Sequence, residues 1–155
     1  MTEPIIEQIL REMESQGATI TTTNGYQYSI ASVLRSIVNL DTGDIPALVI
    51  IPGTEETERM HGKVHISRIV AVEAKAEIGT ENPSTIQERL LADVVECFTR
   101  PDQQGGTFGW ARLAEDVNYT GGGPQGPPSE DQEYTGIIAN FTIRYKVLKG
   151  DPYQQ

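Results

Sequence analysis

The sequence predicts an α+β domain in which two helices cover one face of a mainly antiparallel β-sheet, with a long C-terminal β-hairpin as an arm. Two segments carry apolar residues at helical spacing. In the other regular segments, apolar and polar residues alternate or the apolar residues form short runs, as in strands. Their order is helix, hairpin, strand, long strand, helix and long hairpin. With no internal repeat and no domain-sized linker, the 155 residues are expected to form one domain, residues 1–155.

The first helix is predicted from Pro4 to Glu14. Thr2 is its candidate N-cap, and Gly17 is a candidate for its end. The residues that share its apolar face are Ile5, Ile6, Ile9, Leu10 and Met13.

A β-hairpin is predicted at Asn24 and Gly25, because a type I′ turn needs positive φ at both central positions. The strand after this turn is expected to run to Val38. A second turn, residues 41–44, separates it from a short buried strand, residues 46–51. Pro52 and Gly53 close that strand.

The stretch from Gly53 to Met60 is expected to be a solvated loop that carries Glu55, Glu56 and Glu58. From Gly62 to Ile78, apolar and polar residues alternate as they do in a single strand. Its 17 residues would span roughly 55 Å, whereas a common strand spans about 17–20 Å. We therefore expect this strand to bend, to contain a bulge or to overhang the domain.

The clearest amphipathic helix runs from Asn82 to Thr99. Asn82 is a good N-cap, Pro83 suits the first helical position, and Pro101 ends the helix after Arg100. The single Cys97 is expected to be a buried structural thiol. The predicted apolar stripe is Ile86, Leu90, Leu91, Val94, Val95 and Phe98, and the opposite face is Gln87, Glu88, Asp93 and Glu96.

Two alternating segments, residues 111–119 and 137–147, form the predicted C-terminal hairpin. The glycines and prolines between them exclude helix and regular strand, so residues 121–130 are expected to project as a flexible loop. Tyr119 and Tyr134 are expected to pair across its base. The residues proposed to contact a neighbouring subunit or partner are Gly121, Gly122, Gly123, Pro124, Pro127 and Pro128.

The formal net charge of −10 is opposite to the basic footprint of a protein that grips nucleic acid. An acidic surface is either simply solvated or suited to lying near DNA without holding it. No apolar run is long enough to span a bilayer, and the N-terminus lacks the basic and apolar regions of a signal peptide. We therefore expect a protein that is used without secretion and makes no membrane contact.

The sequence offers little chemistry. His61 and His65 lie at a spacing that chelates metal on a helix, but the alternating pattern places them on a strand, roughly 13 Å apart. The carboxylate pairs Asp41/Asp44 and Glu55/Glu56 fall in a turn and an acidic loop. No GxSxG nucleophile motif is present. We expect no catalytic residues, no metal and no cofactor.

The order of segments resembles the tail terminator (tail completion) proteins of long-tailed bacteriophages. The resemblance covers nearly the whole chain and rests on the order and spacing of NGYQYSIASV, IPALVIIPGTEE, KVHISRIVAVEAKAEI, NPSTIQERLLADVVECF and IIANFTIRYKV. It implies an α+β fold and a homo-oligomeric ring, commonly of six subunits, at the head-proximal end of the tail tube. The Gly/Pro-rich arm has no counterpart in the family's pattern.

The implied function is that of a structural virion protein at the tail–head junction, assembled in the host cytoplasm. Its partners would be the tail tube protein and a head-completion or neck protein, and DNA would pass through without specific binding. On this reading Glu55, Glu56 and Glu58 are candidates for an acidic lumen. The alternatives are a head-completion or head–tail joining protein and, from another class, a cytoplasmic binding module or a small enzyme.

Overall fold

A computed structural model describes residues 2–36, 40–100, 113–126 and 133–155. These residues confirm the predicted fold class, with two α-helices and a five-stranded, mostly antiparallel sheet that does not close. The elements are α1 (Ile5–Gly17), η1 (Thr22–Asn24), β1 (Ser32–Leu34), η2 (Thr42–Asp44), β2 (Ala47–Met60), β3 (Lys63–Glu77), α2 (Pro83–Thr99), β4 (Asp116–Pro124) and β5 (Tyr134–Leu148).

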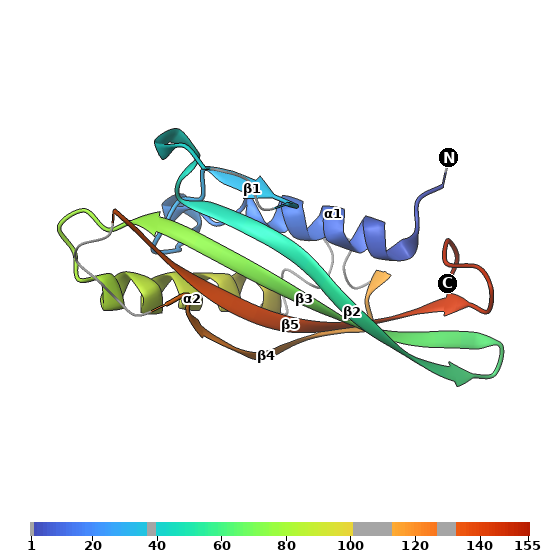
Figure 1. The fold of residues 1–155 in the computed structure, drawn as a ribbon. Coiled ribbons are helices and arrows are strands. Elements are labelled where there is room, and N and C mark those ends of the chain that lie inside the picture. The colour runs from blue at the N-terminus through green and yellow to red at the C-terminus, as the bar shows by residue number, and fades with distance from the viewer. Residues whose placement is uncertain (1, 37–39, 101–112, 127–132) are drawn as a thin grey trace.

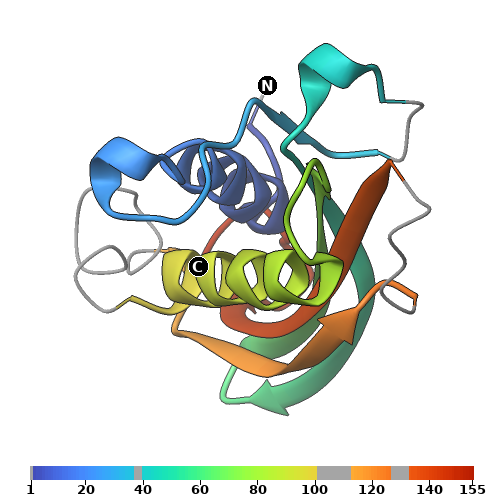
Figure 2. The ribbon, with the colours of Figure 1, turned by 90° about the vertical axis from the view of Figure 1, so that its left-hand side faces the viewer.

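The molecule has two layers, a twisted sheet and a pair of helices (Figure 1). The strand order is β1-β2-β3-β5-β4, and only the β1–β2 pair is parallel. Both helices lie against the same face of the sheet, as Figure 2 shows from the end. α1 contacts β1 and β2, whereas α2 contacts β3, β4 and β5. The apolar core therefore lies between one face of the sheet and the helix pair, as predicted.

α1 is longer than its predicted range, and it ends at the predicted Gly17. Pro4 precedes the helix and no side chain caps it, so the proposed Thr2 cap was wrong. A Cβ atom on Gly17 would lie 3.0 Å from Leu48 Cδ1, which shows how closely the end of α1 approaches β2.

The hairpin predicted at Asn24 and Gly25 was wrong. The segment forms η1, which Gly25 ends with φ 93°. Thr21 Oγ1 accepts the Asn24 amide hydrogen, and the Asn24 side chain donates to the Thr19 carbonyl oxygen at 2.8 Å. These local bonds compete with strand pairing for a segment rich in threonine and asparagine. β1 is short, and residues 37–39 at the end of the predicted strand lie outside the described residues.

The solvated loop predicted from Gly53 to Met60 was also wrong. β2 continues through Pro52 and Gly53 with a register shift before Glu55, and it then pairs with β3 as far as its last residue. The prediction of exposure was correct, because residues 53–60 are all exposed. A fully exposed strand has no apolar alternation, so the sequence pattern gave no signal for it.

α2 begins and ends as predicted, and the Asn82 side chain accepts the Ser84 amide hydrogen at 2.9 Å. Phe98 packs edge-on against Phe141 of β5, with 5.6 Å between ring centroids. Placing Gln87 and Asp93 on the solvent face was wrong, because both are buried. Each has a polar partner that compensates its burial.

Gln87 Nε2 donates to Thr135 Oγ1 at 2.9 Å. The Asp93 carboxylate accepts the backbone N–H groups of Gln27 and Tyr28 at 3.0 and 2.9 Å. Asp93 therefore fastens the irregular segment after η1 to α2. Burial raises the pKa of Asp93, although the two backbone donors act in the opposite direction.

Candidate functional site

One end of the sheet extends beyond the helix layer (Figure 1). We call it the projecting end and define it as residues 55–68 of the β2–β3 hairpin with residues 144–148 of β5. Its inner face still joins the core, since Ile66, Tyr145 and Val147 are buried. Met60 at the tip and Ile69 on the outer face are 48% and 44% exposed. The long strand therefore overhangs the domain, one of the three outcomes expected for it.

A two-residue turn closes the projecting end. His61 and Gly62 both have positive φ, 48° and 80°, and Met60 pairs directly with Lys63. Positive φ at both central positions is typical of a type I′ turn, whose twist matches that of paired strands. The Gly62 carbonyl oxygen accepts the Lys149 amide hydrogen at 3.0 Å, so the end of β5 is tied to the same turn.

An ion pair marks the place where β2 leaves the core. Glu55 Oε2 lies 3.1 Å from Arg68 Nη1 directly across the β2–β3 ladder. Burial, mainly, and the neighbouring Glu55 carboxylate raise the pKa of Tyr145 to about 12. Arg68 falls on the inner face between Ile66 and Val70, because alternate residues of a strand share a face. The ion pair therefore lies on the inner face at the start of the overhang, between the buried residues Ile66 and Val70 of β3.

The three glutamates proposed for an acidic lumen do not lie on one face of the strand. Glu55 points to the inner face and is paired with Arg68. Glu56 and Glu58 are exposed and lie opposite Ser67 and His65 in the β2–β3 ladder. Glu56 lies on the opposite side of the strand from Glu55, so this pair does not have the geometry for joint acid–base work. Their place in a ring lumen stays a prediction.

The two histidines are also separated. His61 lies in the turn, and His65 Nδ1 lies 3.6 Å from Glu115 Oε2 on the outer face. Lys146 Nζ is 3.2 Å from the other oxygen of Glu115. Among the described residues, no group of three His, Cys, Asp or Glu side chains is arranged to hold a metal ion.

Part of the predicted flexible arm is regular strand. Gly121, Gly122, Gly123 and Pro124 all pair with β5, so the expectation that this run excludes strand was wrong. Pro127 and Pro128 lie outside the described residues. The predicted Tyr119–Tyr134 pair was also wrong: Tyr134 lies opposite Glu77, and Tyr119 lies opposite Phe141.

Glycine is what allows this pairing. Gly121 follows a register shift and has φ 130°, which L side chains rarely adopt. A Cβ atom on Gly122 would lie 2.3 Å from the Ile138 carbonyl oxygen, inside the backbone of β5. The glycine run therefore serves close strand contact, a role that composition alone does not distinguish from flexibility.

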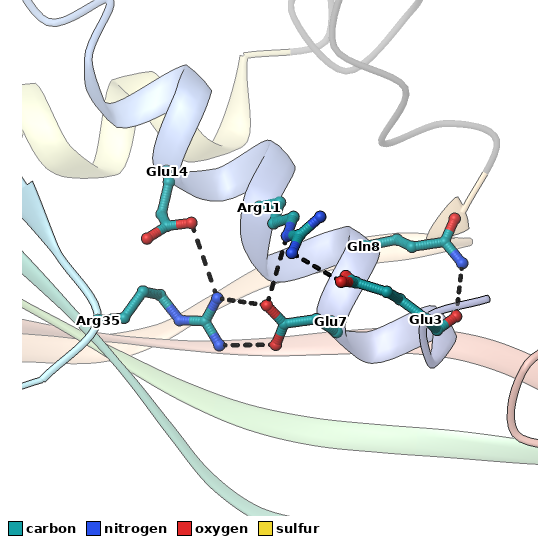
Figure 3. A network of polar contacts seen from close by, with 6 residues as sticks. All are labelled: Glu3, Glu7, Gln8, Arg11, Glu14 and Arg35. Carbon is teal, nitrogen blue, oxygen red and sulfur yellow. Dashed lines mark hydrogen bonds and ion pairs between the residues drawn. The ribbon is translucent and has the colours of Figure 1, made fainter. Parts of the chain in front are cut away.

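A polar network fixes β1 to α1 (Figure 3). Arg35 binds both carboxylate oxygens of Glu7, at 3.1 and 3.2 Å, and lies 3.7 Å from Glu14. The hydrogen bond from Arg35 is the main reason that the pKa of Glu7 is lowered. Arg11 pairs with Glu3 at 2.7 Å. Because each charge in this network has an oppositely charged partner within the chain, we assign the network a structural role.

The two remaining candidates for chemistry also have structural explanations. Cys97 is fully buried, its Sγ donates to the Gln16 carbonyl oxygen at 3.3 Å, and burial raises its pKa to about 12. This confirms the predicted structural thiol. A surface hollow of about 330 Å³ is lined by residues 78–82, whose one titratable group, Glu81, pairs with Arg89 at 3.0 Å.

No protein-family model and no curated protein matches this chain. None of the helices in the described parts of the chain has the length and apolar character needed to cross a membrane. We take the projecting end as the candidate functional surface, because it extends beyond the helix layer and its β2 strand is exposed. Sequence reasoning gave the overhang of the long strand as one of three outcomes but missed the β2 strand that pairs with it, because that strand has no alternation. The one available signal for the second strand was Gly62, which suits a turn.

Proposed function

We propose that this chain is a structural virion protein that forms a ring at the head-proximal end of a phage tail tube. The ring stops polymerisation of the tube and presents the surface to which the head joins. The observation that carries this proposal is the projecting end, a folded and paired part of the sheet that extends beyond the helix layer and whose β2 strand is exposed. Such a surface suits contact with a neighbouring protein.

The β2 edge of the projecting end adds to this argument. β1 pairs only with residues 47–49 of β2. Within the described parts of the chain, no other strand pairs with that edge of β2, and its exposed residues continue to the turn. Unpaired backbone N–H and C=O groups on an edge strand favour pairing with another chain. An assembly protein uses such edges, and it needs neither a cofactor nor an active site.

A terminator must bind the growing end of the tube and present a different face to the head-completion or neck protein that joins it. Tube rings repeat because each offers complementary faces above and below, and such head-to-tail contacts do not close along the axis. The proposed partners are further copies of this chain, the tail tube protein and a head-completion or neck protein; a ring of six copies is what the resemblance to tail terminator proteins implies.

DNA has to pass through the proposed ring without being held. Attraction to phosphates through Lys and Arg would oppose that passage. A chain with a net charge of −10 suits a neutral or acidic lumen, and Glu56 and Glu58 are exposed candidates to line it. A ring structure whose lumen is lined mainly by Lys and Arg would contradict this part of the proposal.

The decisive experiment is deletion of the gene from its phage. We expect filled heads and tails of abnormal, mostly excessive length that fail to join them, as measured by electron microscopy. Finished tails of normal length beside defective heads would reject the terminator role and favour a head-completion protein. Negative-stain images of the purified protein provide a second test. A tail terminator and a head-completion protein are both expected to form rings, whereas a monomeric enzyme or binding module is not.

A further inference from the structure

The sheet has a second free edge besides that of β2. Among the described residues, β1 alone covers the outer edge of β2, and only at residues 47–49. β4 pairs with β5 on one side, and within the same parts of the chain no strand pairs with its other side. Both edges therefore present backbone N–H and C=O groups to which another strand can bind.

The two free edges run in opposite directions. The strands β2, β3, β5 and β4 are antiparallel at each step, so β4 is antiparallel to β2. When copies of the chain are related by rotation about an axis along the strands, β4 of one copy meets β2 of the next in the antiparallel sense. The sheet can then continue from copy to copy with its alternation of strand direction unchanged. The chain thus supplies both halves of one contact.

The backbone groups at the β2 edge follow from the hairpin. In a two-residue hairpin, the residues beside the turn form a hydrogen-bonded pair, here Met60 and Lys63. Hydrogen-bonded and non-hydrogen-bonded pairs alternate along an antiparallel ladder. Thr57 precedes Met60 by three residues with no register shift between them, so its N–H and C=O groups point to the free edge.

Charge disfavours the pairing of β2 with β2 of another copy. Glu56 and Glu58 lie on the outer face, opposite Ser67 and His65 of β3. A two-fold pairing centred on any of residues 56–58 would place glutamates opposite glutamates, which destabilises a strand pair. β4 has one acidic residue, at position 116, and therefore suits the β2 edge better.

We propose that β2 of one copy pairs with β4 of the next, with Glu58 opposite Asn118. The outer face holds both side chains, since Asn118 is exposed and alternates with the buried Val117. The register also sets Thr57 opposite Tyr119, a β-branched and an aromatic side chain that favour each other across strands. Slipping by two residues would instead set Glu58 against an acidic residue. This inference rests on the proposed ring function and names the strands that join its subunits.

Disulfide trapping tests the register. Within one chain, positions 58 and 118 are three strand spacings apart, roughly 14 Å, which is too far for a disulfide. Oxidation of the variant Glu58→Cys with Asn118→Cys should therefore yield covalent dimers and larger species on non-reducing gels. The native Cys97 is buried. The matched control, Glu56→Cys with Asn118→Cys, is two residues out of register and should cross-link about tenfold less.

A proline at Thr57 tests the backbone contact. Thr57→Pro removes an N–H group that points to the free edge, a position at which a strand tolerates proline. Circular dichroism should show an unchanged fold, whereas sedimentation velocity should show a dissociation constant raised at least about tenfold. Thr57→Ala keeps the N–H group and should associate as the wild type does.

Four results would overturn the inference: a monomeric wild type, no cross-link in the double-cysteine variant, equal cross-linking of the out-of-register control, or unchanged association of Thr57→Pro. Cross-linking of Glu58→Cys alone as strong as that of the double variant would show β2 paired with itself and would also overturn it. If rings persist without the expected cross-link and the deletion phage makes overlong tails, the inference fails while the proposed function stands. If the cross-link forms but the deletion phage makes tails of normal length, the strand pairing stands and the terminator role fails.

Discussion

The covered half of the sheet and its projecting end are built from the same strands in different ways. In the covered half, alternate residues of β3 such as Val70, Val72 and Ala74 are buried against the helices. In the projecting end, β2 has exposed residues throughout, and pairing and a two-residue turn hold it in place. The first half obtains its stability from burial. The second leaves most of its side chains available to another molecule, so the two halves should respond differently to substitution.

The largest expected effect is at Cys97 in the covered half. Cys97→Asp places an unpaired charge at a fully buried position between the two helices, and we expect it to lower the free energy of unfolding by more than about 3 kcal/mol. The measurement is urea denaturation followed by circular dichroism. The control in the projecting end is Met60→Asp at the exposed tip, which should cost less than about 1 kcal/mol. Equal losses at the two sites would break the distinction between the halves.

Asp93 provides the next largest effect. Asp93→Ala removes the acceptor for two backbone N–H groups, those of Gln27 and Tyr28. Leaving such donors unpaired costs about 1–3 kcal/mol. The same denaturation measurement checks it, with Glu96→Ala on the exposed side of α2 as the control. A loss no greater than that of the control would show that Asp93 does not fasten this segment.

A third substitution tests how closely β4 approaches β5. Gly122→Ala would place Cβ 2.3 Å from the Ile138 carbonyl oxygen, so the strands must shift. Overpacking of this kind costs about 1–3 kcal/mol. The neighbouring Gly123→Ala meets nothing within 4 Å and should be neutral within about 0.5 kcal/mol. If the two variants have the same midpoint of thermal unfolding, the glycine run is not needed for strand contact.

The covered half could be predicted from the sequence because burial leaves a periodic pattern. The apolar stripe of α2 and the alternation of β3 located both elements to within a residue or two. In α2 and β2 the errors occurred where polar groups are buried or where a strand is exposed. Gln87 and Asp93 look like surface residues, and only their partners on distant segments explain their burial.

The candidate site could not be predicted because its strand has no core face of its own. Residues 53–60 are polar on both sides, so their order comes from the register with β3, which is a long-range property. The glycines of β4 were misread for a related reason. A glycine that permits close contact and one that permits flexibility are identical in the sequence.

A smaller effect concerns the pH dependence of the Asp93 contact. Burial raises the pKa of Asp93 above the ordinary value of 3.8, so the folded state binds its proton more tightly than the unfolded state does. This contribution to stability is fully present below the ordinary pKa and is lost as pH rises through the folded-state pKa. Relative to Asp93→Asn, the wild type should therefore lose stability as pH rises above 3.8 and through the folded-state pKa. A difference that is constant over this range, or that changes in the opposite sense, would contradict the shift.

The smallest effect is expected in the projecting end itself. Glu56 and Glu58 are exposed, and neither takes part in an ion pair within the described parts of the chain. Replacing both by Gln keeps their shape and removes two charges. Because surface substitutions of this kind change stability by less than about 0.5 kcal/mol, the urea midpoint should stay that of the wild type. If these carboxylates line the lumen of a ring, the same variant should leave assembly unchanged but slow the release of DNA through finished particles. A clear loss of stability would instead mean that the fold depends on these two charges. The projecting end would then resemble the covered half in needing its side chains for stability, and the contrast between the two would fail.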